Sequence, residues 1–371
     1  MIQTLITYLT LFIVMYALVY LQKFYRNDKF LGIGKFSLLA LLIYSIILGC
    51  RYNVGVDYAG YLGYYEQITK FNGANDRFEY LFALISWSFS DANLHYSIYF
   101  TFWAFLQIYL LFLSVKNERY IYPSLVFSLI IGCFFLTYMN GIRQMTSFCI
   151  LAYSLKYIIQ ENWKKYILAI IIAFLIHKSA IIVFPLYFIF NFKNEYFKSI
   201  KVQIVMLAIS LILLILNFND KILYIIEKIT SLINYGKYAS AMRNGTLEII
   251  AMKRERGVGF FVILILNIYL ILMSRKVKKY VSNKKYNIMY DLYFIGVLWF
   301  YLFNGSLILN RPNYYFYSFR LFVVSFTLFY VFKTKNILLI SFNIFLVFML
   351  FAAIMYRMEE NTSLFTFFWQ N

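Results

Sequence analysis

Residues 166–192 read YILAIIIAFLIHKSAIIVFPLYFIFNF, and this run decides the class of fold. It holds about 27 mostly apolar residues, more than the roughly 20 that one helix needs to cross a bilayer. His177, Lys178 and Pro185 interrupt it. We therefore predict a membrane segment that breaks near these residues. Two paths stay open: a single crossing, or a broken or re-entrant pair that goes out and returns.

The rest of the chain follows the same pattern. Of its 371 residues, 63% are hydrophobic and 14% charged, whereas soluble domains carry about 25% charge. We predict an all-α, polytopic transmembrane helical bundle with about 11–12 membrane segments. One integral membrane domain spans 1–371, with 218–257 as an outer loop. The first run has no basic leader and no cleavage site, so we read it as a retained helix. The other apolar runs lie at 4–22, 34–50, 95–115, 121–139, 143–159, 202–217, 258–274, 288–308, 316–332 and 336–356.

Basic residues set the predicted orientation, because Lys and Arg accumulate in cytoplasmic loops. We expect both the loop at 23–35 and the cluster at 275–285 on the cytoplasmic side. This needs one more membrane crossing than results when each apolar run crosses once. A returning 166–192 supplies that crossing, and a crossing by 222–235 is the rival. The returning path gathers the unusual polar residues on the outer face: Arg51, Asp57, Arg143, His177, Arg311 and the C-terminal tail.

The formal net charge is +19. We attribute it to cytoplasmic loops in contact with membrane lipids, with no nucleic-acid partner. The outer loop is also basic, which favours an anionic ligand. Its cations are Arg243, Lys253, Arg254 and Arg256.

Three arginines are candidate ligands for an anion or a substrate. Arg143 follows the turn signal Asn140-Gly141, which places a cation in the first turn of a helix. A helix N-terminus and an arginine both favour phosphate, although an interfacial arginine reaching to lipid headgroups is the alternative. Arg311 precedes Pro312, which suits the first helical position. Arg320 lies deeper among apolar residues, as a structural ion pair or as a substrate contact.

His177, Lys178 and Asp57 are the other candidates for chemistry. His177 is one of two histidines and suits general acid–base or phosphate-binding work, or a structural role at the helix break. Lys178 adds positive charge beside it. Asp57 is either the N-cap of the helix that follows or a general base. Which of the two residues is the base stays open.

Arg51 and the tyrosines near it have competing readings. Arg51 suits the dipole at the outer end of the second helix, which favours a structural role. Its proximity to Asp57 in the sequence leaves a functional role open. Tyr58 and Tyr61 suit stacking on sugar rings or interfacial anchoring. The three cysteines lack metal-ligand spacing, so we expect buried inert thiols, no metal and no cofactor.

The chain resembles the EpsG/Wzy family of bacterial polysaccharide polymerases. The resemblance rests on motifs in a fixed order. They are RYNVGVDYAGYLGYY (51–65), FEYLFALISW (78–87), NGIRQMTSFCILAYSLKY (140–157), FLIHKSAIIVFPLY (174–187) and, more weakly, RPNYYF (311–316).

This resemblance implies a function. Wzy-type proteins join oligosaccharide repeat units carried on undecaprenyl pyrophosphate, at the outer face of the bacterial cytoplasmic membrane. It implies a lipid-linked donor and acceptor, a Wzz-type chain-length regulator as partner, and an architecture like that of C-type glycosyltransferases. Arg51, Asp57, Arg143 and His177 match positions of the motifs, without assigned roles. With the implied function, we expect Arg143, Arg311 and Arg320 to hold the pyrophosphate and Arg51 to fix the Asp57 loop or the donor. A flippase for lipid-linked oligosaccharides, an O-antigen-ligase-like transferase and a membrane acyltransferase are the alternatives.

Overall fold

A computed structural model describes residues 2–25, 27–71, 78–192, 195–218, 221, 257–304, 307–360 and 364–370. Every regular element in these ranges is a helix, and the isolated bridge between Arg51 and Phe367 is the extended pairing found there. The predicted all-α class is therefore confirmed. The chain divides into two compact units, Met1–Asn194 with Leu321–Asn371 and Glu195–Arg320. Each is described by itself.

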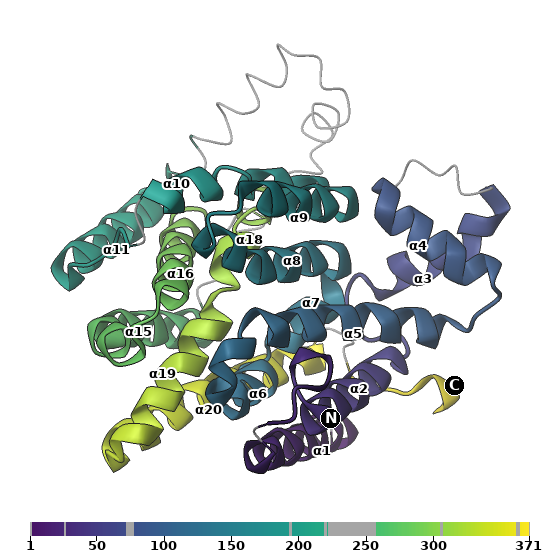
Figure 1. Ribbon diagram of the computed structural model, residues 1–371, viewed down its shortest axis with the longest axis horizontal. Helices are drawn as coiled ribbons and strands as arrows, with labels where there is room; N and C mark the ends of the chain where they lie inside the picture. The colour runs from purple at the N-terminus through teal and green to yellow at the C-terminus, as the bar shows by residue number, and fades with distance from the viewer. Residues whose placement is uncertain are drawn as a thin grey trace. The chain divides into compact units, whose positions relative to one another are not determined.

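Helices of the first unit lie side by side in a row (Figure 1). Among these helices the order along the row follows the order in the sequence, and α5 contacts both α2 and α8. Close approach of α2 and α5 depends on Gly49, whose added Cβ would lie 1.9 Å from Thr101 Oγ1. The row comprises α9 (Trp163–Ile176), α8 (Ile142–Ile159), α5 (Tyr96–Ser114), α2 (Lys35–Gly49) and α1 (Ile2–Leu21).

Further helices complete this unit. α6 (Tyr122–Ile131) packs on α1, and α20 (Ile337–Glu360) packs on α6. α19 (Arg320–Thr334) contacts α6 through a hydrogen bond from Ser325 to Ser128. Two shorter helices, α3 (Tyr58–Gln67) and α4 (Tyr80–Asp91), stand beside α5.

The predicted apolar runs coincide with helices. By their length these helices fall into two groups. Within the described ranges, four helices are long and apolar enough to cross a membrane, or five if a bent pair counts as one. Four shorter apolar helices are Lys35–Gly49, Lys178–Phe192, Ile200–Ile215 and Ile337–Ala353. The chain is thus a multi-pass membrane protein.

The predicted break in 166–192 is confirmed. α9 ends at Ile176, and the chain continues through a 3-10 helix, Lys178–Val183, into α10 (Leu186–Phe192). The Tyr166 hydroxyl, in the first turn of α9, donates to the carbonyl of Val183 at 2.6 Å. Since a straight helix would separate these residues by about 25 Å, the chain reverses direction at His177.

A second break lies in the predicted run 121–139, where the sequence had suggested one continuous segment. α6 and α7 (Phe134–Asn140) are bent by 66°. Cys133 between them has φ 56°, in the left-handed region. A residue in that conformation ends a helix, and the apolar composition of the run hides the break.

Residues Glu195–Arg320 form the second unit. It contains α11 (Ile200–Ile215), α15 (Val258–Val281), α16 (Lys284–Leu302), α17 (Leu307–Asn310) and α18 (Tyr314–Tyr317). Lys278 bonds Glu195 at 3.0 Å and lies 3.4 Å from fully buried Asp291. The Asn267 amide donates to Tyr301 and Tyr317 and accepts from Tyr293. Asn267 and its three tyrosine partners therefore link α15, α16 and α18 through hydrogen bonds.

Candidate functional site

Glu79 is the centre of the polar cluster in the first unit. It occupies the N-cap position of α4, with extended backbone (φ −68°, ψ 151°), yet its side chain makes no capping bond to that helix. Oε2 instead accepts from Arg143 Nη1. Oε1 accepts from His177 Nδ1 at 3.1 Å and from the backbone N–H of Lys178 at 3.0 Å. One carboxylate thus joins α4, α8 and the break after α9.

Arg143 reaches this carboxylate from the first turn of α8, as predicted from the Asn140-Gly141 turn. α7 ends at Asn140 and α8 begins at Ile142. A cation in the first turn opposes the helix dipole, and the charge of Glu79 compensates for it. The guanidinium also stacks 4.0 Å from the centre of the Phe78 ring. Its side chain stays 20% exposed, so an anion can approach it.

His177 enters the cluster because α9 ends one residue before it. The extended backbone of His177 (φ −154°, ψ 113°) turns the chain, while its N–H still bonds the carbonyl of Ala173 at 2.8 Å. The imidazole is 22% exposed, and the Lys178 side chain is exposed. The other histidine, His95, caps α5 through Ser97.

Electrostatics keep Glu79 ionised. Burial raises the pKa of its carboxyl, but the hydrogen bonds from His177 and the Lys178 backbone, together with the charge of Arg143, outweigh burial and lower the pKa to about 2. At neutral pH the cluster holds the Glu79 anion and the Arg143 cation, and Lys178 joins it through its backbone N–H. The exposed Lys178 side chain adds a positive charge next to His177, which favours an anionic ligand.

We expect acid to weaken the fold through this carboxylate. A folded-state pKa of about 2 against an ordinary value of 4.5 means that the unfolded chain binds the proton more readily. The stabilisation is complete above pH 4.5 and is lost as the pH falls toward 2. Thermal unfolding in detergent from pH 6 down to about 3 measures it for wild type and Glu79→Gln. The gap in melting temperature should narrow as the pH falls, and a gap independent of pH would contradict the assignment.

Arg51 lies beside this cluster in a buried position. It is 2% exposed, donates to the carbonyls of Leu48 at 2.6 Å and Met139 at 3.3 Å, and stacks over the Phe100 ring at 4.7 Å. The C-terminal tail pairs with its neighbours, since Tyr52 N–H donates to Thr366 O at 2.8 Å. In this structure Arg51 ties the end of α2 to the end of α7 and to the tail.

Asp57 opens α3 and is exposed. It holds the N-cap position, as one reading predicted, but its side chain makes no capping bond to the helix. The loop before it approaches α7 closely: Gly55 has φ +106°, and an added Cβ there would lie 2.2 Å from Asn140 Oδ1. The Asp57 loop therefore packs against the turn that precedes Arg143.

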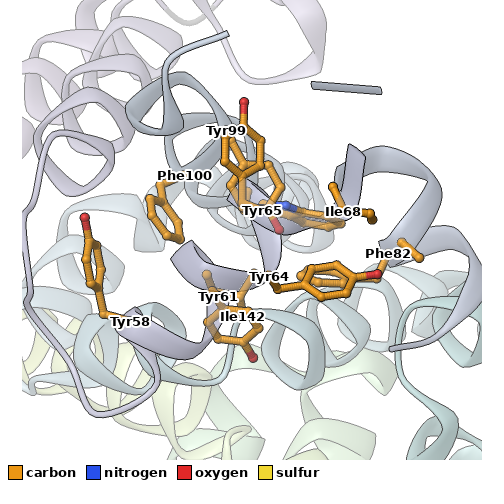
Figure 2. Packing of buried hydrophobic residues seen from close by; sticks show 11 residues of the cluster. Tyr58, Tyr61, Tyr64, Tyr65, Ile68, Phe82, Tyr99, Phe100 and Ile142 are labelled. Carbon is orange, nitrogen blue, oxygen red and sulfur yellow. The ribbon is translucent and has the colours of Figure 1, made fainter. Parts of the chain in front are cut away.

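Tyr58 and Tyr61 belong to an aromatic cluster between α3, α4 and α5. They are 2% and 6% exposed. Figure 2 shows Phe100 lying between Tyr58 and Tyr99, and the ring centres of Tyr58 and Phe100 are 5.2 Å apart. Burial raises the pKa of Tyr61, while nearby Arg143 opposes the rise and Asp57 adds to it. Tyr61 thus lies within the electrostatic reach of both.

Arg311 and Arg320 belong to the second unit. Arg311 is exposed in a turn before α18, which begins at Tyr314 with Asn313 as its N-cap. Pro312 therefore precedes the cap, and our placement of Pro312 at the first helical position was wrong by two residues. The cause is Asn313, whose amide donates to the carbonyl of Gly296 and fixes the turn. Arg320 Nη1 donates to the Tyr317 hydroxyl at 2.7 Å.

Three further predictions concern metal ligands, the cysteines and the basic residues of the outer loop. Among the described residues, no group of three or more His, Cys, Asp or Glu side chains is placed to hold a metal ion. Cys133 and Cys149 are buried and Cys50 is partly exposed. The basic residues Arg243, Lys253, Arg254 and Arg256 lie outside the described residues.

Glu79 is the residue that sequence reasoning did not select. Glu79 is the second residue of the motif FEYLFALISW and directly precedes an amphipathic stretch. This is the position of an N-cap residue. The available signal was that acidic residues are rare in this chain, with 16 Asp and Glu among 371 residues. Nothing local indicates that Glu79 turns away from its own helix toward residues 64 and 98 positions later.

The comparison with known proteins covers nearly the whole chain. No curated protein and no solved structure matches it, so the likeness to C-type glycosyltransferases stays a prediction. The profile of the EpsG family matches residues 34–369. The match includes the Arg51 loop, Glu79, Arg143, His177 and the tail. The chain belongs to the EpsG family.

Proposed function

We propose that this protein is a polysaccharide polymerase that joins undecaprenyl-pyrophosphate-linked repeat units at the outer face of the bacterial cytoplasmic membrane. Membership of the EpsG family supports a polymerase-like function in general. The observation that carries the specific proposal is the cluster around Glu79, where Arg143, His177 and Lys178 meet at one carboxylate. It combines a partly exposed guanidinium with a partly exposed imidazole.

This pairing suits glycosyl transfer from a lipid pyrophosphate. The donor arrives already activated, so the site needs groups that bind a leaving pyrophosphate and a base for the acceptor hydroxyl. Developing negative charge on the leaving group is stabilised by fixed cations, and we assign this task to Arg143 and Lys178. Phosphate binding by Arg311 and Arg320 stays a separate proposal, drawn from the sequence. A base that removes the hydroxyl proton completes the reaction.

Neighbouring residues have supporting roles in this proposal. Arg51 positions the loop that carries Asp57, since it fixes the ends of α2 and α7. Tyr58 and Tyr61 hold α3 against α5 from buried positions, and stacking on a sugar ring stays a proposed role for them. A Wzz-type chain-length regulator stays the proposed partner.

Reconstitution tests the reaction. The purified protein is placed in liposomes with the lipid-linked repeat unit extracted from a polymerase-deficient strain of the source organism. We expect a ladder of polymer lengths without added ATP, metal or nucleotide sugar. Movement of the intact substrate across the bilayer without chain growth would favour a flippase. Transfer of one unit to a different acceptor would favour a ligase-like transferase.

Cysteine accessibility tests the proposed orientation. Single cysteines at 143, 177 and 311 are introduced in a variant whose native cysteines are replaced. We expect each to react with a membrane-impermeant maleimide added outside intact spheroplasts. A cysteine in the basic cluster, at Arg275, is the matched control and should react only after permeabilisation. The reverse pattern would contradict the outward-facing site.

A further inference from the structure

We propose that Glu79 is a positioning residue that fixes the tautomer of His177, so that His177 Nε2 is the base that deprotonates the acceptor hydroxyl. This inference rests on the proposed function and settles the choice between His177 and Asp57. Its physical basis is one hydrogen bond, 3.1 Å long, from the imidazole to a carboxylate oxygen.

The protonation state follows from the two partners. An ionised carboxylate only accepts hydrogen bonds, so the proton between the two atoms belongs to His177 Nδ1. Ionisation of Glu79 is secured by its remaining donors, Arg143 Nη1 and the Lys178 N–H. A neutral imidazole with its proton on Nδ1 carries a free lone pair on Nε2. That lone pair is the acceptor of a proton in general base catalysis.

The backbone makes this arrangement rigid. The same oxygen, Oε1, accepts from the His177 ring and from the N–H of the next residue, Lys178. The His177 N–H is bonded to Ala173 O, so both ring and main chain are held. The imidazole nevertheless stays 22% exposed, while its Nδ1 edge is occupied by Glu79. The accessible nitrogen is therefore Nε2.

Asp57 is in a different setting. Its carboxylate is exposed at the start of α3, whereas the imidazole of His177 is bonded to Glu79 and is itself only partly exposed. The charge of Asp57 acts on Tyr61, which also feels Arg143. Asp57 is then placed to orient Tyr61 or a sugar hydroxyl instead of removing a proton.

The transfer step forms one glycosidic bond, breaks one bond to pyrophosphate and moves one proton. The acceptor hydroxyl gives its proton to His177 Nε2, and its oxygen forms a bond to the anomeric carbon of the donor sugar. The bond from that carbon to the pyrophosphate oxygen breaks, and its electron pair leaves with undecaprenyl pyrophosphate. Arg143 and Lys178 offset the charge that develops. The imidazolium then returns its proton to water.

Nuclear magnetic resonance tests the tautomer without an activity assay. The full chain is labelled with ¹⁵N-histidine in liposomes, with His95→Asn to leave one signal; asparagine keeps the cap of α5. We expect His177 to carry its proton on Nδ1 at neutral pH in this protein and in Glu79→Gln, whose amide oxygen still accepts. Glu79→Ala should shift the population to the Nε2–H form. A proton on Nε2 with Glu79 present would overturn the inference.

The pH profile of polymer formation tests the base. Glu79 of α4, Arg143 of α8 and Lys178 of the 3-10 helix are charged groups next to His177, and Tyr61 of α3 lies near Arg143. The acid limb of the profile, which is the loss of rate at low pH, reports protonation of the base. It should be present in both wild type and Glu79→Gln.

Substitution of the two candidate bases separates the outcomes. His177→Gln should lower the rate about 100-fold or more and remove the acid limb, whereas Asp57→Asn should keep that limb. Wild-type kinetics in His177→Gln, or loss of the limb in Asp57→Asn, would overturn the role of His177 while polymerisation itself stands. A wild-type protein that makes no ladder would instead overturn the proposed function, and the tautomer result would stay valid.

Discussion

Arg143→Ala is expected to reduce polymer formation about 100-fold or more, the effect seen when one donor to a developing anion is removed. The guanidinium is the partly exposed cation that also bonds Glu79. Its removal takes away a proposed pyrophosphate ligand and one of three donors to a buried carboxylate. Ladder formation from the lipid-linked repeat unit in liposomes measures the loss, and the amount of folded protein in detergent is recorded in parallel.

Two variants make this result specific. Arg143→Lys keeps the charge but loses the planar fork that binds phosphate through two hydrogen bonds, so we expect partial activity. Arg275→Ala removes an exposed arginine from the basic cluster and should keep normal activity. Product of wild-type length and amount from Arg143→Ala would reject the phosphate role.

Gly49→Ala is expected to have the largest effect on stability. An added Cβ would lie 1.9 Å from Thr101 Oγ1, 2.7 Å from Thr101 N and 2.8 Å from Ser97 O. Two of these atoms are backbone atoms of α5, which cannot rotate away. Overpacking costs about 1–3 kcal/mol and sometimes more, and we expect the upper end. Thermal unfolding in detergent should show a clearly lowered midpoint.

Glycines of α3 supply the matched controls. Gly60 and Gly63 have nothing within 4 Å of an added Cβ. Alanine is favoured over glycine inside a helix by about 0.8–1 kcal/mol, so Gly60→Ala and Gly63→Ala should unfold at the wild-type temperature or slightly above. Equal midpoints for Gly49→Ala and Gly60→Ala would show that the contact between α2 and α5 is looser than described.

The resemblance identified the correct family. The order and spacing of motifs can be compared in the sequence without knowing the fold. The motifs had placed Arg143 at a helix start and His177 at a helix break, and both positions are confirmed. These are local features, set by a turn signal and by polar residues inside an apolar run. The bend at Cys133 was missed because a left-handed residue leaves no trace in hydropathy.

The sequence by itself determined that this protein is a helical membrane protein of the EpsG family with a break near His177, and the structure added that the chain reverses direction there. Hydropathy and breaks act over a few neighbouring residues, so they can be read directly. Only the tertiary structure decided that Arg51 is buried among carbonyls and rings, and that Glu79 joins Arg143 and His177. These contacts link residues 64 and 98 positions apart. Their physical reason is helix packing, which brings buried charges together so that each finds a partner.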